Sequence, residues 1–164
     1  MTKLYVAYGS NLHKEQMSYR CPGAEVVYKG IIEDYALVYR GSKTGAYATI
    51  IPSKGDYVPV AVWKINEEHE KSLDRYEGYP TFYYKKGIKV SLGNGRAVSA
   101  MVYIMFDEAK PGTPSMRYLE ICGQGYLDQG LDMVKLEESI VRNKAETAPM
   151  APYLARVASG QVYK

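Results

Sequence analysis

The chain has 164 residues, of which 46% are apolar and 24% charged, so it can form one domain spanning residues 1–164 and is not a disordered protein. The formal charge of +3 is spread along the sequence without a block of like charges, which argues against a nucleic-acid-binding tail. No stretch approaches the roughly 18 apolar residues that cross a bilayer, and no signal peptide is visible, so we expect a cytoplasmic protein without a membrane partner.

Short strands dominate the first two thirds of the sequence. Segments rich in Val, Ile and Tyr, separated by Gly, Pro and Asp, are typical of strands. They cover residues 3–10, 24–41, 47–52, 57–65, 82–92 and 96–106. The second of them is long enough that we expect a bend at Gly30 or near Asp34. Because few helices alternate with these strands, we predict an α+β fold with a curled, mainly antiparallel sheet that is barrel-like.

Four helices are expected among the strands. They cover residues 11–23, 66–78, 115–127 and 131–143. Asn11 and Asn66 are suitable N-caps for the first two, and Gly78 is a suitable end for the second. The tail from Lys144 to Lys164 is expected to be irregular.

The first strand ends in Tyr8, Gly9, Ser10 and Asn11, which form the first candidate site. Gly9 permits backbone conformations that other residues resist, and the first amides of the helix expected here have no intrahelical partner. A carboxylate or a developing oxyanion could accept these N–H bonds and gain from the helix dipole. Taken alone, the spacing favours an ordinary strand–turn–helix junction capped by Asn11.

Glu77, in the segment "SLDRYEGYP", is the second candidate. It lies in the last turn of the expected helix, where the dipole disfavours negative charge, and tyrosines and Pro80 are its neighbours. A carboxyl group so placed tends toward a raised pKa, which suits a group that moves protons. The alternative is an exposed glutamate at the end of a surface helix. Glu70, Asp74 and His69 are expected on the solvated face of the same helix.

Tyrosine is unusually frequent, with 17 residues against two Phe and one Trp. Tyr83, Tyr103 and Tyr118 follow three different elements, so they either fill the core, which is the default, or line one cavity. Two histidines and two distant cysteines offer no metal-ligand spacing, so we expect no metal site and two reduced core thiols. Because nucleophile-elbow and phosphate-loop motifs are also missing, an enzyme built on this chain must use carboxylates, tyrosines and backbone groups.

Several segments, taken together and in order, resemble the gamma-glutamylcyclotransferase family. They are "LYVAYGSNL", "YATIIPSKGDYVPVAVWKI", "SLDRYEGYP", "VYIMF" and "PSMRYLEICGQGY", and the resemblance runs from Leu4 to about Leu136. A single piece such as YGSN is weak, whereas the ordered set, with a Glu-Gly pair closing the helix, is specific. The resemblance implies a curled, mainly antiparallel sheet with a few helices around an open cavity. It also implies an enzyme that releases 5-oxoproline from gamma-glutamyl compounds without cofactor or metal.

The resemblance also implies roles for particular residues. Glu77 matches the family's acid/base glutamate, and the loop from Tyr8 to Asn11 would hold the gamma-glutamyl end of the substrate, largely through backbone amides. The substrate's own alpha-amine would then attack its gamma-carbonyl and close a five-membered lactam. Glu77 would take the ammonium proton and return it to the departing nitrogen.

Three tyrosines also match family positions. Tyr83 and Tyr103 match tyrosines of the cavity wall, with Tyr84 as a competitor for Tyr83, and Tyr118 matches a tyrosine that contacts the ligand. The polar loops 40–46 and 107–113 leave the identity of the leaving amine open, and nothing in the sequence indicates an oligomeric state.

Two questions stay open at the level of sequence. The tail after residue 144 is unmatched; Tyr153, Arg156 or Lys164 could close the cavity, although a packed surface tail is favoured. The rival to an enzyme is a binding module that uses the same cavity for a small ligand or a partner. Glu77 argues against that rival, because a buried carboxylate contributes little to binding an anionic glutamyl group.

Overall fold

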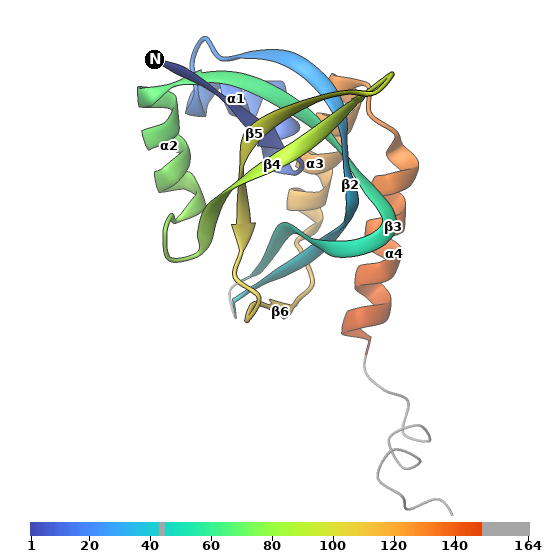
Figure 1. Ribbon diagram of the computed structural model, residues 1–164. Helices are drawn as coiled ribbons and strands as arrows, with labels where there is room; N and C mark the ends of the chain where they lie inside the picture. The colour runs from blue at the N-terminus through green and yellow to red at the C-terminus, as the bar shows by residue number, and fades with distance from the viewer. Residues whose placement is uncertain (43–44, 149–164) are drawn as a thin grey trace, which may run out of the picture.

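The computed structural model describes residues 1–42 and 45–148 of the chain. Within these residues, six strands and four helices alternate irregularly (Figure 1). The strands are β1 (Thr2–Ala7), β2 (Glu25–Ser42), β3 (Gly45–Asn66), β4 (Tyr83–Gly93), β5 (Arg96–Met105) and β6 (Lys110–Pro111). The helices are α1 (Lys14–Arg20), α2 (Glu67–Glu77), α3 (Met116–Gln129) and α4 (Met133–Thr147), and a short 3-10 turn, η1 (Ser10–Leu12), precedes α1.

The strands form one sheet that curls into a ring. Their order is β3-β1-β5-β4-β2-β6, and β2 also pairs with β3, which closes the ring. All pairings are antiparallel except that of β1 with β5, which meet at Tyr5 and Met101. The ring is not a regular barrel, because β2 and β4 pair only at Ile31 and Ser91. The predicted α+β fold with a curled, mainly antiparallel sheet is confirmed.

The long hairpin of β2 and β3 bends near Asp34, as expected. The register shifts there, and Asp34 itself adopts a left-handed backbone conformation with φ of 61°. Glu33 pairs with Tyr57 and Tyr35 with Pro52, so four residues of β3 lie opposite Asp34. The prediction of two separate strands at 47–52 and 57–65 is wrong, because this insertion interrupts the ladder without ending the strand.

The first helix begins later than predicted. His13, whose Nδ1 accepts a hydrogen bond from the amide of Gln16, is the N-cap of α1. Asn11 instead belongs to η1, and its side chain is bonded to Tyr5, Glu77 and Arg20. The predicted N-cap role of Asn11 is therefore wrong, because its amide group is occupied by other side chains.

Helix α2 has the caps predicted for it, and α3 and α4 begin within two residues of their predicted starts. Asn66 and Ser115 cap α2 and α3, and Gly78 ends α2 in the left-handed conformation with φ of 65°. Helix α4 continues to Thr147, so the irregular structure expected from Lys144 is wrong for its first four residues. Residues Tyr153, Arg156 and Lys164 lie outside the described residues.

His69 is a further correction, because it is buried on α2 and not solvated. Its Nδ1 accepts a hydrogen bond from the amide of Asn66, and its Nε2 donates to the carbonyl of Pro22 at 2.6 Å. Sequence spacing placed it on the outer face, whereas the loop after α1 covers that part of α2. The two cysteines, Cys21 and Cys122, are buried and free, as expected.

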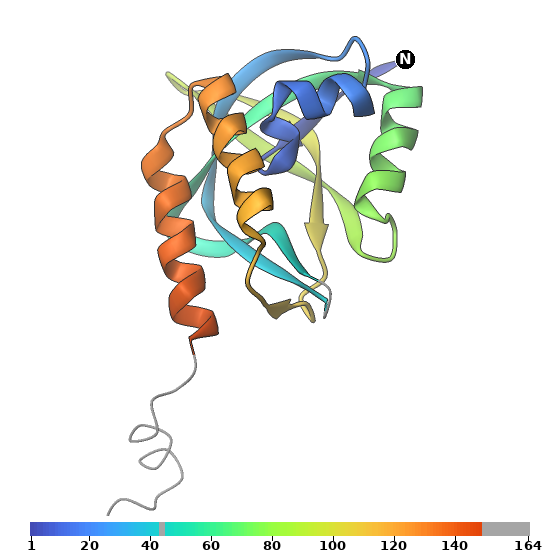
Figure 2. The same cartoon turned by 180° about the vertical axis from the view of Figure 1, so that it is seen from behind.

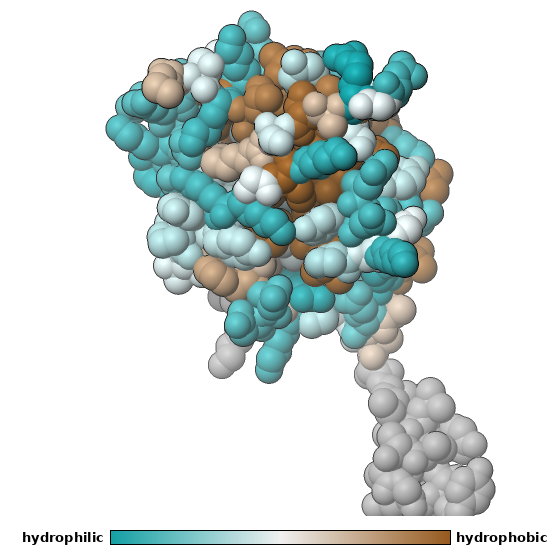
Figure 3. Space-filling model, in the orientation of Figure 1, coloured by the Kyte–Doolittle hydropathy of each residue, from teal (hydrophilic) through white to brown (hydrophobic). Residues whose placement is uncertain are grey.

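Helices α1, α3 and α4 lie together on one side of the ring (Figure 2). Helix α3 packs directly on η1, since a Cβ atom at Gly125 would lie 2.7 Å from Cβ of Leu12 and 2.9 Å from the amide nitrogen of His13. On the opposite side, apolar surface is visible over the region of β4 and β5 and is framed by polar side chains (Figure 3). Among the described residues, no helix combines the length and apolarity needed to span a membrane.

Candidate active site

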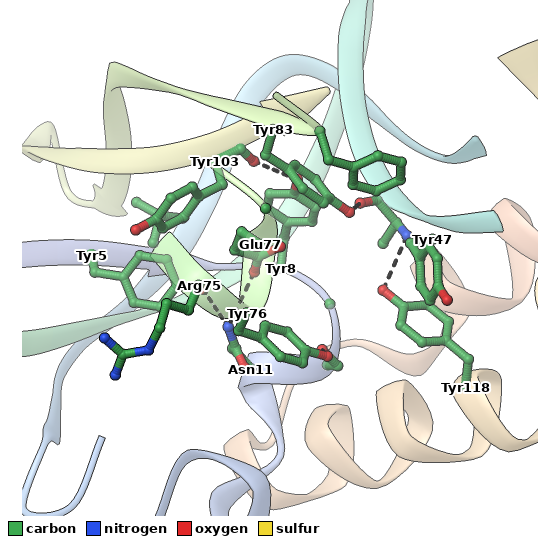
Figure 4. A pocket seen from close by; sticks show the side chains of 16 residues that line it. Tyr5, Tyr8, Asn11, Tyr47, Arg75, Tyr76, Glu77, Tyr83, Tyr103 and Tyr118 are labelled. Carbon is green, nitrogen blue, oxygen red and sulfur yellow. Dashed lines mark hydrogen bonds between the residues drawn. The ribbon is translucent and has the colours of Figure 1, made fainter. Parts of the chain in front are cut away.

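A cavity of about 420 Å³ opens where β1 ends and α2 ends (Figure 4). Its wall is built from β1 and η1, the last turn of α2, parts of β3, β4 and β5, and the first turn of α3. The cavity brings together all eight residues singled out in the sequence. They are Tyr8, Gly9, Ser10, Asn11, Glu77, Tyr83, Tyr103 and Tyr118.

The loop after β1 is fixed by contacts from three directions. The indole Nε1 of Trp63 donates to the backbone oxygen of Asn11 at 3.1 Å, and Nε2 of Gln129 donates to that of Leu12 at 2.9 Å. At Gly9, an added Cβ atom would lie 3.1 Å from Cβ of Ala48 and 3.2 Å from the hydroxyl of Tyr118. Glycine therefore allows the loop to approach β3 and α3 this closely.

Glu77 is the last residue of α2 and directs its carboxyl group into the cavity (Figure 4). Oε1 lies 3.4 Å from Nδ2 of Asn11, a long hydrogen bond. Burial of the carboxyl group raises its pKa from 4.5 to about 8, although Arg20 acts in the opposite direction. The pKa of Glu77 is thus close to neutral pH, which suits a group that must both accept and return a proton.

Most tyrosine hydroxyls around the cavity already have partners in the protein. Tyr8 donates to the carbonyl of Tyr103 at 2.6 Å, and Tyr83 donates to that of Ala48 at 2.7 Å. The hydroxyl of Tyr118 accepts from the amide of Ala48 at 3.0 Å. These bonds join the loop after β1, β3, β4, β5 and α3 into one wall.

Tyr103 and Tyr83 both line the cavity, but their surroundings differ. Tyr103 lines the cavity, but its hydroxyl donates to Oδ1 of Asp74 at 2.6 Å, outside the space that Glu77 faces. Tyr83 is buried and lines the cavity, whereas Tyr84 packs against Phe106 with ring centroids 5.0 Å apart. Of the two candidates for a cavity tyrosine, the geometry therefore favours Tyr83.

Several lining residues were not predicted from the sequence. Tyr5 accepts a hydrogen bond from Nδ2 of Asn11 at 2.8 Å, and the hydroxyls of Tyr76 and Ser10 are 3.0 Å apart. Tyr47 and Phe82 pack edge to face with centroids 6.1 Å apart. Tyr5 shares a strand with Tyr8 and Tyr76 adjoins Glu77, so proximity in sequence could have indicated them. Phe82 likewise adjoins Tyr83, whereas Tyr47 reaches the cavity only through the tertiary fold.

The wall offers one carboxyl group, several neutral hydroxyls and the amides of the loop. Across residues 1–42 and 45–148, no three His, Cys, Asp or Glu side chains gather in a way that could hold a metal ion. The arrangement can bind a small polar molecule, move a proton through Glu77 and exclude bulk water from one side of the reacting group.

A family model described as gamma-glutamyl cyclotransferase, AIG2-like, matches residues 5–120. The chain belongs to this gamma-glutamyl cyclotransferase family. The matched segment contains the loop after β1, Glu77 and all three tyrosines predicted by resemblance, so the resemblance identified in the sequence is confirmed at the level of the family.

Relatives in the gamma-glutamyl cyclotransferase family are similar over most of their length. A human protein named gamma-glutamylcyclotransferase is 35% identical over 139 residues, which cover 79% of this chain and 73% of that protein. The mouse protein of the same name is 34% identical, again over 79% of this chain and 73% of that protein. A solved structure named gamma-glutamyl cyclotransferase superposes with a TM-score of 0.75 at 29% identity, covering 98% of this chain and 99% of the other.

Proposed function

We propose that this protein cyclises a gamma-glutamyl amino acid or amine, releasing 5-oxoproline and the free amine, with Glu77 as general acid/base. Family membership supports the reaction, since the curated relatives carry the name of this enzyme. The observation that carries the assignment of Glu77 is its carboxyl group, which faces the cavity and whose pKa is raised to about 8.

The reaction needs no second substrate. Glu77, as carboxylate, takes a proton from the alpha-ammonium group of the substrate, and the freed amine attacks the gamma-carbonyl carbon. A carbon–nitrogen bond forms and closes the five-membered ring, and the carbon–nitrogen bond to the leaving amine breaks. Glu77 gives its proton to that departing nitrogen and returns to the carboxylate form. The ring nitrogen then gives up its second proton, which Glu77 passes to the released amine, so that the amine leaves as an ammonium ion. Since nucleophile and electrophile belong to one molecule, the enzyme mainly has to fold the substrate and transfer protons.

The raised pKa of Glu77 fits both halves of this cycle. A carboxylate with an ordinary pKa would be a weak base toward an ammonium group, and a carboxylic acid with a pKa of about 8 would return its proton readily near neutral pH. When the positively charged alpha-ammonium enters the cavity, it favours the ionised form of Glu77. A general acid/base of this kind is typically worth about 10²–10⁴-fold in rate.

The remaining wall residues would bind and orient the substrate. The amides of Gly9, Ser10 and Asn11 are suited to hold the glutamyl carboxylate or the oxyanion that develops on the gamma-carbonyl. The rings of Tyr83, Tyr103 and Tyr118, with Tyr8, would exclude water and hold the glutamyl chain in its bent conformation.

A panel of gamma-glutamyl compounds tests this proposal. Gamma-glutamyl alpha-amino acids, gamma-glutamyl alkylamines and a compound linked through the lysine side chain are incubated with the folded protein, and 5-oxoproline is measured. We expect at least one class to be converted, and Glu77→Gln to lose at least about 100-fold in kcat while still binding that compound. Binding without conversion of any of them would favour a non-catalytic module that uses the same cavity. Undiminished activity of Glu77→Gln would remove Glu77 from the mechanism.

A further inference from the structure

Arg20 lies behind the cavity, at the end of α1, and is not among its lining residues. We propose that Arg20 is a positioning residue that orients the side-chain amide of Asn11 toward Glu77 and, with its own charge, keeps the Glu77 carboxyl group able to ionise. The inference rests on the proposed function, since it assigns a role in preparing the same acid/base group.

The hydrogen bonds of Asn11 define the orientation of its amide. Nη1 of Arg20 donates to Oδ1 of Asn11 at 2.6 Å. With the oxygen held there, Nδ2 of Asn11 lies 2.8 Å from the hydroxyl of Tyr5 and 3.4 Å from Oε1 of Glu77. A flipped amide would turn its NH₂ group toward the guanidinium and its oxygen toward the carboxylate, which sets donor against donor and acceptor against acceptor. Arg20 therefore selects the orientation in which Asn11 donates to Glu77.

Arg20 is itself held in place by two contacts. Its Nη2 donates to Oε1 of Gln16, one turn earlier on α1, and its Cζ atom lies 3.5 Å above the ring of Tyr76. A guanidinium over an aromatic face is attracted by the ring quadrupole and loses little freedom on binding. Because the hydroxyl of Tyr76 meets that of Ser10, the same residue also joins Arg20 to the loop after β1.

Arg20 differs in charge from the other groups that act on Glu77. Six tyrosines surround Glu77, five on other parts of the chain and Tyr76 beside it on α2, and burial raises the pKa of each, so all are neutral near pH 7. They are Tyr5 on β1, Tyr8 after it, Tyr76 on α2, Tyr83 on β4, Tyr103 on β5 and Tyr118 on α3.

The remaining charged and titratable neighbours do not replace Arg20. Arg75 lines the edge of the cavity but is exposed, and its guanidinium points away from Glu77 (Figure 4). Cys21 follows Arg20, and burial raises the pKa of its thiol to about 11, so it is neutral. Tyr47, on β3, also lines the cavity. Burial raises the pKa of Glu77, and Arg20 is the group that opposes this effect.

The test compares Arg20→Met, which removes the charge and the hydrogen bond, with Arg20→Lys, which keeps the charge but loses the planar fork. Lys14→Met is the matched control, since Lys14 is an exposed cation on the same helix. The ionisation of Glu77 is followed by carboxyl NMR in the ligand-free protein and assigned with Glu77→Gln. We expect the midpoint to rise by about one pH unit in Arg20→Met, by less in Arg20→Lys, and not at all in Lys14→Met.

The pH dependence of kcat/KM on the best gamma-glutamyl compound gives a second measurement. Its acidic limb should move by the same amount, so that Arg20→Met loses about tenfold at pH values below the midpoint and recovers at higher pH. A structural residue would instead lower activity equally at every pH and leave the midpoint in place, and this result would overturn the proposal. Failure of both Arg20 variants to fold would also overturn the proposal, because Arg20 would then be needed for the fold itself.

The two measurements separate this inference from the proposed function. A shifted Glu77 midpoint without turnover of any gamma-glutamyl compound by the wild-type protein would refute the proposed function and leave the positioning role standing. Turnover by the wild-type protein with an unmoved midpoint in Arg20→Met would refute the positioning role alone.

Discussion

Glu70 and Glu77 lie on the same helix, α2, and have opposite electrostatic environments. Glu70 forms ion pairs with Lys3 and Lys85 at 2.8 and 2.9 Å. Burial raises its pKa, but the hydrogen bonds from these lysines outweigh burial and lower the pKa overall. Glu77 meets tyrosines and the amide of Asn11 instead, and its pKa rises to about 8. Burial raises the pKa of both carboxyl groups, but Glu77 is the more deeply buried, and the single charge of Arg20 does not outweigh that burial as the two lysines do at Glu70.

Tyr103 stands between these two environments. Its ring lines the cavity, while its hydroxyl donates to Asp74, which is also bound by Lys85 at 2.9 Å. The face of α2 that carries Glu70 and Asp74 is thereby attached to the cavity wall without placing a lysine beside Glu77. One helix can therefore carry a stabilising ion-pair network and a proton-transfer group.

The largest expected effect on wild-type activity is that of pH. Because kcat/KM reports the ionisation of the free enzyme, it should rise about tenfold per pH unit well below the pKa of Glu77, or about 50-fold from pH 6 to pH 8. The measurement is the initial rate of 5-oxoproline formation at low substrate concentration. Glu70→Gln should keep the same profile, since Glu70 does not face the cavity. A flat profile down to pH 5 would show that the two carboxyl groups do not differ as described.

A second effect is expected on stability. The folded-state pKa of Glu77, about 8, exceeds its ordinary value of 4.5, so the unfolded chain releases this proton first and the wild-type protein loses stability as pH rises between these values. Glu77→Gln lacks this loss and should be more stable than wild type by up to about 5 kcal/mol at pH 9, with the difference vanishing near pH 4. Denaturant unfolding at pH 4, 6, 8 and 9 measures it.

Glu70→Gln is the matched control and should change stability in the opposite direction. A carboxylate with a lowered folded-state pKa contributes stability above its unfolded pKa of 4.5, and that contribution is lost as pH falls through the folded value. The variant should be less stable than wild type by about 1 kcal/mol at pH 7 and nearly equal to it in acid. Parallel stability curves for the two variants would contradict the difference between Glu70 and Glu77.

The smallest effect on activity is expected for Tyr103→Phe. The ring that lines the cavity remains, and the lost hydroxyl is bound to Asp74, so kcat/KM should change less than about threefold while stability falls by about 1 kcal/mol. Steady-state kinetics and denaturant unfolding measure the two quantities. A loss of more than about 30-fold in kcat/KM with unchanged stability would instead assign the hydroxyl to substrate binding.

The sequence predicted those features that depend on neighbouring residues. Asn66 and Gly78 fix the two ends of α2, and so make Glu77 its last residue. The alternation of Val, Ile and Tyr located most strands, and the order of the family segments brought together the residues of the cavity.

Features that depend on distant contacts were missed. His69 looks exposed on a helical wheel but is covered by the loop at Pro22. Asn11 resembles a cap, yet Arg20 and Tyr5 occupy its amide. The hydroxyl of Tyr103 could have pointed to the substrate, and only the position of Asp74 shows otherwise. Such partners are set by the tertiary fold, so no local pattern carries them.

The engaged tyrosine hydroxyls have a consequence for ligand binding. Tyr8, Tyr83 and Tyr103 each donate to a protein acceptor before any ligand arrives, and these bonds fix their rotamers. The conformational entropy of these side chains is thus lost when the chain folds and not when a molecule enters the cavity. A bound compound should leave the tyrosines in the same rotamers as in the free protein, and most of the ordering on binding should fall on the compound itself.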